Sequence, residues 1–222
     1  MNAPKTNAQP PAITCLFLDI GGVLLTDGWG RKSRALAADV FNLDPEEMEN
    51  RHRQAFDAYE TGKMNLEEYL DLVVFHQKRP FTRANFRSFM LGQSEANPRM
   101  LALIGELKAR HGLKIVVVSN EGRELNAHRI RKFKLNGFVD AFISSCFVRL
   151  RKPDADIFKL ALEVAQVPPE RVLYIDNTPM HIEVAKRLGI QSILHTDCQS
   201  TCAGLAACGL PCTDEGASHE SH

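Results

Sequence analysis

The chain has 222 residues, of which 44% are hydrophobic and 24% are charged, proportions typical of a soluble globular protein. Its 27 basic residues are matched by 27 acidic ones, so no net charge favours nucleic acid or an anionic membrane, and a small-molecule partner is expected. No segment approaches the roughly 20 uninterrupted apolar residues of a membrane-spanning helix, and the N-terminus does not resemble a secretion signal; a cytoplasmic location is therefore expected.

The first predicted element is a buried strand that begins at Ile13. Its apolar run ends at a carboxylate, Asp19, and Gly21 and Gly22 follow directly. This pattern predicts that the strand delivers Asp19 to its tip and that the chain then turns sharply on the two glycines. Burying a carboxylate is costly unless it is paired, bound to a metal or exposed at the tip. Asp19 is therefore the first residue predicted to be chemically active.

Residues 28–95 are predicted to form an all-helical insert. Apolar residues recur at three- and four-residue spacings in four segments, which are Gly30–Phe41, Pro45–Tyr59, Asn65–Gln77 and Thr82–Met90. Asp44, which precedes a proline and two glutamates, is typical of a helix start. The insert is expected to form a domain of its own.

After Asn97, helices and strands alternate. Helices are predicted at 98–111, 121–133, 153–166 and 178–188, and strands at 113–118, 138–144, 171–175 and 190–195. Such alternation predicts an α/β fold with a doubly wound, Rossmann-like parallel sheet that is covered by helices on both faces. The α/β core domain would comprise 12–27 and 96–210, and the tails 1–11 and 211–222 are expected to be disordered.

The six cysteines form two groups. Cys15 and Cys146 lie in apolar runs and are expected to be reduced core residues. The other four lie near the C-terminus, on and beside a helix predicted at 199–208; they are Cys198, Cys202, Cys208 and Cys212. Their spacing is looser than the C-x2-C pairs of most zinc sites, so packing of an amphipathic helix is the preferred interpretation, while metal binding stays open.

Polar side chains follow the ends of the predicted parallel strands. Asp19 ends the first strand, Ser119 and Asn120 end the second, Asp176 and Asn177 end the fourth, and Lys152 follows the third in a loop. Sheets of this type bind ligands at the carboxyl ends of their strands. These side chains are therefore predicted to meet at one edge of the sheet.

Four segments together resemble the haloacid dehalogenase-like (HAD) hydrolase superfamily in order and spacing. They are FLDIGGVL, VVVSN, RKPDADIF and YIDNTPMHIEVAKRLGI. The likeness extends over about residues 12–195, with the helical insert in the position of that family's cap. The first and third segments are similar to the branch that includes glucose-1-phosphatase-like enzymes and the N-terminal domain of soluble epoxide hydrolase.

The resemblance implies a phosphatase that acts through an aspartyl-phosphate intermediate on a small phosphorylated metabolite. Asp19 would be the nucleophile, Lys152 a catalytic cation that also restrains Asp19, and Ser119 and Asn120 would bind the substrate. A Mg²⁺ cofactor would be held by Asp19, the Gly21 carbonyl, and Asp176 or Asn177. Substrate identity and oligomeric state stay open.

The chain departs from the family pattern at Gly21. Family phosphatases carry there a second Asp that protonates the leaving oxygen and then activates water, a role that glycine cannot fill. Another group, such as Asp27, Thr26 or a cap residue, could take over. Alternatively, the substrate needs no acid, as in family enzymes that cleave carbon–phosphorus bonds with a cap lysine; the candidates are Lys32, Lys63 and Lys78.

Two further alternatives follow from the same glycine. Dehalogenases of the family also lack the second Asp, but they usually carry Tyr in its place. Finally, the protein could be a catalytically impaired member that binds a ligand or partner without turning it over.

Overall fold

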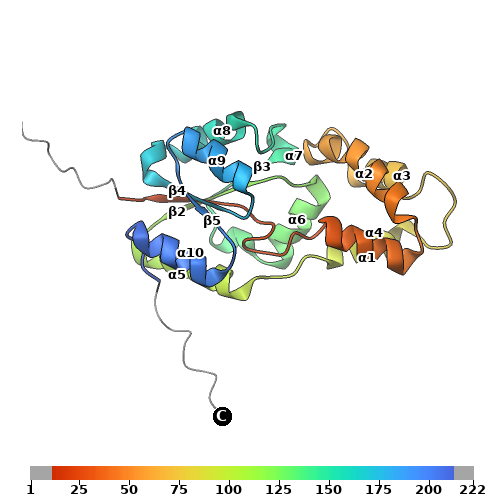
Figure 1. Ribbon diagram of the computed structural model, residues 1–222, viewed down its shortest axis with the longest axis horizontal. Helices are drawn as coiled ribbons and strands as arrows, with labels where there is room; N and C mark the ends of the chain where they lie inside the picture. Colours follow the sequence, from red (N-terminus) through yellow and green to blue (C-terminus); the bar gives the residue numbers. More distant parts are fainter. Residues whose placement is uncertain (1–11, 213–222) are drawn as a thin grey trace, which may run out of the picture.

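The computed structural model describes residues 12–212, which contain a single five-stranded, all-parallel sheet. Its strands are β1 (Cys15–Leu18), β2 (Lys114–Ser119), β3 (Ala141–Ser144), β4 (Val172–Asp176) and β5 (Gln191–Leu194), in the spatial order β3-β2-β1-β4-β5 (Figure 1). The predicted Rossmann-like fold is confirmed. Because β1 lies in the centre between β2 and β4, the residue that follows β1 is flanked by two other strand ends.

Helices cover both faces of the sheet. On one side lie α5 (Pro98–His111) and α10 (Cys198–Ala207), and on the other α8 (Ala155–Ala165) and α9 (Pro179–Arg187) (Figure 1). The alternating side chains of β1 serve both layers: Leu16 packs toward α5 and Phe17 toward α8. Double coverage explains why the strands read as continuous apolar runs.

Shorter elements connect these layers. The helix α6 (Arg123–Lys132) follows β2, and α7 (Ser145–Val148), which was not predicted, follows β3. Two 3-10 turns, at Leu135–Gly137 and Pro169–Arg171, precede β3 and β4.

The insert between β1 and α5 consists of four helices with their own apolar cluster, here called the cap. They are α1 (Arg31–Phe41), α2 (Pro45–Glu60), α3 (Leu66–Val73) and α4 (Arg83–Gly92). Asn65 caps α3 through a reciprocal hydrogen-bond pair with Glu68. The helix ends four residues earlier than predicted, because the Val74 carbonyl at its end accepts a hydrogen bond from Arg79 Nε (2.8 Å) instead of continuing the helical ladder.

The chain crosses between core and cap twice, and the two crossings are bonded to each other. Thr26 N–H donates to the Glu95 carbonyl (2.9 Å), and the Thr26 hydroxyl donates to the Gln93 carbonyl (3.0 Å). Asn97 N–H donates to the Leu24 carbonyl (2.9 Å). The cap therefore leaves the core as a paired, hydrogen-bonded stem.

The far end of α2 docks on the core at α7. Ser145 Oγ donates to the Glu60 carbonyl (2.6 Å), and Arg149 donates to the Thr61 carbonyl (3.0 Å). Gly62 follows with φ +64°, and a Cβ at this position would lie 2.1 Å from the Cys146 carbonyl oxygen. Only glycine satisfies both the left-handed backbone and the close approach of the two chains.

We expect Gly62→Ala to destabilise the protein by about 2–4 kcal/mol, because it adds left-handed strain to a collision with backbone that cannot move aside. Urea unfolding should report this loss as a lower midpoint. Gly105→Ala is the matched control: Gly105 lies within α5 with nothing close to the added methyl, so it should stabilise the protein by about 0.5–1 kcal/mol. Equal midpoints for Gly62→Ala and the wild type would contradict this account of the docking.

The predicted disordered tails lie outside the described residues at 1–11 and 213–222. The boundary of the C-terminal tail, predicted at 211, needs a correction. Pro211 and Cys212 were assigned to the disordered tail, but the Pro211 carbonyl accepts a hydrogen bond from Arg110 (3.2 Å) and Cys212 packs on the sheet layer with the other three C-terminal cysteines. Cys15 and Cys146 are buried free thiols, as predicted. Between residues 12 and 212, no helix is long and apolar enough to cross a membrane.

Candidate active site

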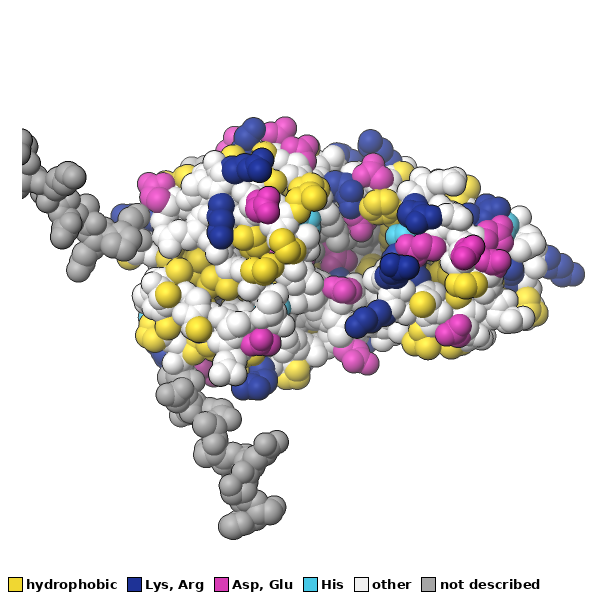
Figure 2. Space-filling model, viewed as in Figure 1, with side chains coloured by type: hydrophobic (Ala, Val, Ile, Leu, Met, Phe, Trp, Pro, Cys, Tyr) yellow, Lys and Arg dark blue, Asp and Glu magenta, His cyan; other side chains and the backbone are white. Residues whose placement is uncertain are grey.

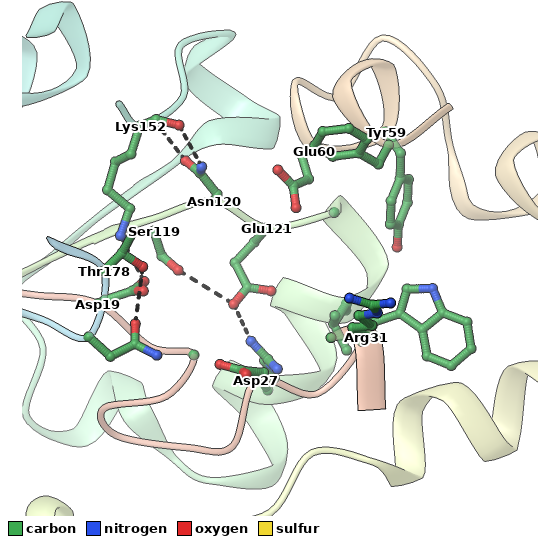
Figure 3. A pocket seen from close by; sticks show the side chains of 18 of the residues that line it. Asp19, Asp27, Arg31, Tyr59, Glu60, Ser119, Asn120, Glu121, Lys152 and Thr178 are labelled. Atoms are coloured by element: carbon green, nitrogen blue, oxygen red, sulfur yellow. Dashed lines mark hydrogen bonds and ion pairs between the residues drawn. The ribbon is translucent and has the colours of Figure 1, made fainter. Parts of the chain in front are cut away.

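A cavity of about 420 Å³ lies between the core and the cap. Figure 2 shows the surface hollowed there, with acidic and basic side chains around the opening. The ends of β1 and β2 and the segment after β4 supply its core side, with Asp19, Ser119, Asn120 and Asn177 in the wall. Lys152 reaches the same wall from the loop after α7 (Figure 3). The strand-end residues that the sequence singled out thus lie together.

Lys152 connects two carboxylates at the bottom of the cavity. Its Nζ lies 3.0 Å from Asp19 Oδ1 and 2.6 Å from Asp176 Oδ2. Asp19 keeps 8% of its surface accessible, while Lys152 keeps 1% and Asp176 none. Of these two carboxylates, Asp19 therefore lines the cavity and Asp176 lies behind it.

The proton affinities of the three groups differ because their surroundings differ. Burial raises the pKa of the Asp19 carboxyl, with Lys152 opposing that shift and the Asp176 charge adding to it. Burial acts in the same direction on Asp176, but Lys152 and His181 outweigh it and hold the pKa of this carboxyl well below its usual range. Burial alone would lower the pKa of Lys152, yet the two carboxylates raise it, so the ammonium stays charged.

Asp176 is held by more donors than the sequence suggested. Its Oδ2 also accepts from the Tyr174 hydroxyl and faces His181 Nδ1 at 3.1 Å, while Oδ1 accepts from Thr178 N–H (2.7 Å). Tyr174 was not predicted as a site residue. Its position two residues before Asp176 in a strand, which places both side chains on one face, is the signal that could have found it.

Ser119 and Asn120 occupy different positions in the site. The Ser119 hydroxyl lies beside Asp19 and, like Lys152, opposes the rise that burial causes in the pKa of its carboxyl. The Asn120 amide is engaged at both ends by the main chain of Lys152: its nitrogen donates to the carbonyl (2.9 Å) and its oxygen accepts from the N–H (2.8 Å). Asn120 thus holds the main chain of Lys152, and since it also lines the cavity its predicted contact with substrate stays a prediction.

Oxygen atoms suited to a hard cation lie beside Asp19. Among the described residues, the Gly21 carbonyl accepts no hydrogen bond, and the Asn177 amide lies over Gly22, where a Cβ would come 2.0 Å from Asn177 Nδ2. No three His, Cys, Asp or Glu side chains within 12–212 form a metal cluster. The Asp19 carboxylate, with Asp176 behind it and neutral carbonyl and amide oxygens beside it, nevertheless makes a donor set that suits Mg²⁺, which keeps several waters and needs few protein ligands.

A buried ion pair that the sequence did not reveal borders the same wall. Glu121 and Arg129 are each 2% exposed, and Arg129 Nη1 donates to Glu121 Oε1. Glu121 Oε1 also lies 3.5 Å from Ser119 Oγ, and its carboxyl group projects into the cavity (Figure 3). Glu121 comes two residues after the end of β2, the position relative to a parallel strand where functional loops are found, and that placement was the available signal.

The cap supplies the opposite wall of the cavity. Trp29 is buried and donates its indole N–H to Tyr69 (2.9 Å), so it both packs the cap and lines the cavity. The Tyr59 hydroxyl points inward and has no hydrogen-bond partner among residues 12–212 (Figure 3). Arg31 reaches the cavity without an ion-pair partner in the described part of the chain. These groups are placed to contact the part of a ligand that lies beyond Asp19.

A family model described as haloacid dehalogenase-like hydrolase matches residues 13–189. The chain belongs to this hydrolase family. The family predicted from the four motifs is therefore confirmed, and with it the assignment to the hydrolases.

Curated relatives match parts of the chain. Bifunctional epoxide hydrolase 2 of Sus scrofa is 29% identical over 111 residues, which cover 48% of this chain and 20% of that enzyme. A phosphorylated carbohydrates phosphatase of Thermotoga maritima is 27% identical over 97 residues, covering 44% of each protein. The matches thus span less than half of either relative.

Solved structures match more of the chain. A HAD family enzyme of Bacteroides thetaiotaomicron in complex with magnesium and inorganic phosphate has a TM-score of 0.68 and 20% identity, and the match covers 82% of this chain and 93% of that one. L-2-haloacid dehalogenase of Xanthobacter autotrophicus with covalently bound chloropropionic acid has a TM-score of 0.59 and 16% identity, covering 89% and 84%. These likenesses establish the fold.

Proposed function

We propose that this protein is a Mg²⁺-dependent phosphatase that transfers the phosphoryl group of a small phosphorylated metabolite to Asp19 and then to water. One observation carries the proposal: Asp19 is the carboxylate at the bottom of a cap-covered cavity, and the ammonium group of Lys152 lies 3.0 Å away. A phosphoryl group needs a nucleophile together with fixed cationic and hydrogen-bond donors, and these groups supply them. The phosphatase relative supports the substrate class.

In this scheme each described side chain has a distinct role. Asp19 Oδ2 attacks phosphorus, because Oδ1 already accepts from Ile20 N–H (2.8 Å) and faces Lys152. The Ser119 hydroxyl and the Lys152 ammonium hold phosphoryl oxygens. Asp176 fixes Lys152 with the help of Tyr174 and His181.

The metal would be held by Asp19, the Gly21 carbonyl, and Asp176 or Asn177. When bound, Mg²⁺ would neutralise phosphoryl charge and offset the repulsion between a dianionic substrate and the Asp19 carboxylate. The magnesium and inorganic phosphate in the Bacteroides thetaiotaomicron structure support this cofactor.

Carbon–phosphorus cleavage through a Schiff base and dehalogenation, the other two reactions compatible with a glycine at position 21, find less support. A Schiff-base mechanism needs a lysine facing the ligand, and Lys152 is the only lysine among the described residues that line the cavity. Lys32, Lys63 and Lys78 are exposed and lie outside that wall. The Tyr that is usual in dehalogenases is replaced by Gly21, and the dehalogenase likeness extends to the fold alone.

We expect the protein to hydrolyse members of a panel of small phosphorylated metabolites in the presence of Mg²⁺ and to lose this activity in EDTA. Released inorganic phosphate is the measurement. Adding back Mg²⁺ should restore turnover, and Ca²⁺, which is larger and geometrically less demanding, should restore it poorly.

The panel also tests the alternative that the protein only binds its ligand. Saturable binding of a phosphorylated compound without phosphate release would favour a catalytically impaired member. Turnover that is unaffected by EDTA would contradict the metal assignment and leave the nucleophile to be tested separately.

A further inference from the structure

The space beside Gly21 is bordered by the backbone of Asp27 and by Arg129 of α6, which pairs with Glu121 in the segment after β2. A Cβ added to Gly21 would meet Arg129 Nη1 at 3.7 Å, an ordinary contact distance. The same nitrogen donates to Glu121 Oε1. Only the Arg129 guanidinium thus separates the Glu121 carboxyl group from the position that a Cβ at residue 21 would take. Glu121 follows β2, whereas Gly21 follows β1.

Glu121 is held in place by buried contacts. Arg129 donates to Glu121, to Ser94 Oγ (3.0 Å) and to the Thr26 carbonyl (3.1 Å), so its guanidinium cannot rotate freely. Ser119 Oγ, which also adjoins Asp19, lies 3.5 Å from Glu121 Oε1. One hydroxyl group therefore separates the Glu121 carboxyl from the nucleophile, a position from which it can approach a group bound to phosphorus.

The other groups considered for proton transfer are less well placed. The Thr26 hydroxyl is used in the stem, where it donates to the Gln93 carbonyl and accepts from Glu95 N–H (3.1 Å), and it does not line the cavity. Asp27 does line the cavity, but it is exposed and no described residue holds its carboxylate.

Glu60 of the cap also lines the cavity and is held by Arg151 (2.5 Å), but among residues 12–212 no hydrogen bond connects its carboxyl group to Ser119 or to the side chain beside Gly21. Glu121 is therefore the acid in the described wall that is both held by a partner and adjacent to Ser119.

We propose that Glu121 is the general acid and base of the reaction, and that it takes the role of the carboxyl group absent at Gly21. This assignment rests on the proposed phosphatase function. It makes Glu121 a catalytic residue and Arg129 a positioning residue.

The proposed reaction transfers the phosphoryl group first to Asp19 and then to water. Asp19 Oδ2 forms a bond to phosphorus, the bond between phosphorus and the leaving oxygen breaks, and that oxygen takes its proton from the Glu121 carboxyl to leave as an alcohol. The resulting Glu121 carboxylate then accepts a proton from water as the water oxygen bonds to phosphorus. The bond between phosphorus and Asp19 breaks, and its electron pair returns to the Asp19 oxygen. The products are the Asp19 carboxylate, the protonated Glu121 and inorganic phosphate.

The electrostatic surroundings of Glu121 agree with this role. Burial raises the pKa of the Glu121 carboxyl to about 7, with Arg129 opposing the shift and Asp19 adding to it. Both protonation states are then populated near neutral pH, which is the condition under which one group can donate a proton in one step and accept it in the next.

The test compares two substrates that are alike in size and differ in the leaving group, 4-nitrophenyl phosphate and 4-nitrobenzyl phosphate, with the Mg²⁺-loaded full chain. A phenolate leaves without a proton, whereas an alkoxide requires one. We expect Glu121→Gln to lower kcat/KM for the benzyl ester by about 10²–10⁴-fold and for the phenyl ester by about tenfold or less. With the phenyl ester, a burst of one nitrophenolate per protein should precede slow turnover, because the base for the second step is missing.

Several outcomes would overturn the assignment. Equal losses for both esters would give Glu121 a structural role, and no loss would exclude it. A wild type that hydrolyses only the phenyl ester would show that no acid acts at all. If Asp27→Asn, and not Glu121→Gln, selectively loses hydrolysis of the benzyl ester, the role of acid belongs to Asp27.

Two further variants separate folding from chemistry. If circular dichroism shows that Glu121→Gln is unfolded, Glu121→Asp, which keeps the charge but shortens the reach, should show the same selectivity against the benzyl ester. Gly21→Asp combined with Glu121→Gln should recover benzyl ester hydrolysis, since the new carboxyl group enters the same space. If Asp19→Asn still releases phosphate, the proposed aspartyl-phosphate mechanism fails; if it is inactive while Glu121→Gln keeps full activity on both esters, only the acid assignment fails.

Discussion

Asp19→Asn is expected to lower phosphate release by at least about 10⁴-fold, the scale seen when an enzyme loses its covalent nucleophile. The amide can occupy the same volume and still face Lys152, but it cannot form a bond to phosphorus. Two measurements should agree: phosphate release should fall to background, and phosphate label should no longer attach to the protein.

Folding should survive this substitution. Lys152 keeps its 2.6 Å ion pair with Asp176, and one of two neighbouring carboxylates is removed, so the melting temperature should not fall. Asp39→Asn is the matched control, because Asp39 is exposed on α1 and far from the cavity wall. It should have wild-type activity. Retention of turnover by Asp19→Asn would exclude the aspartyl-phosphate mechanism.

Lys152→Met is expected to affect both activity and stability. The Lys152 side chain is 1% exposed and its ammonium group neutralises two carboxylates, so replacing it leaves buried negative charge without a partner, at a cost of about 3–5 kcal/mol in the metal-free protein. Activity should fall by about 10²–10³-fold or more, because a donor to the phosphoryl oxygens is lost as well. Urea unfolding in EDTA and phosphate release measure the two effects.

The stability difference between Lys152→Met and the wild type should depend on pH. In the wild type, the pKa of Asp176 is depressed in the folded state, so its contribution to stability is present above the pKa of the unfolded chain and is lost as pH falls. The difference should therefore be large at neutral pH and shrink in acid. Lys159→Met, at an exposed pair with Asp156, should change little at any pH. A difference that does not change with pH would contradict the proposed charge balance.

Local signals were sufficient to predict most of the fold. Short apolar runs such as 172–175, alternating with helical segments, are typical of strands covered on both faces, and the Asp44-Pro45 and Asn65 signals mark helix starts that the structure contains. What the sequence did not reveal depends on tertiary contacts. The early end of α3 follows from a bond made by Arg79, and α7 is a single turn that docks against Glu60.

The candidate site was located but not completed from the sequence. Asp19, Ser119, Lys152 and Asp176 each follow a strand or a motif, and strand ends in a parallel sheet converge by topology. Glu121 follows a strand end too, but its burial depends on Arg129 from the next helix, a tertiary contact that the sequence does not show. The hydrogen bonds between Asn120 and the main chain of Lys152 are likewise tertiary contacts that the sequence does not show.

The contacts of Arg129 have a consequence for exchanging caps between members of this family. Its guanidinium binds Thr26 in one crossing and Ser94 in the other, so a graft boundary drawn between these residues and the cap keeps both acceptors with the core. A boundary drawn on the core side of Thr26 and Ser94 would take these two residues from the donor protein, while Arg129 would still come from the recipient. Chimeras should therefore retain residues 26 and 94 of the recipient, so that a new substrate-binding lid can be tested without disturbing the acid beside the nucleophile.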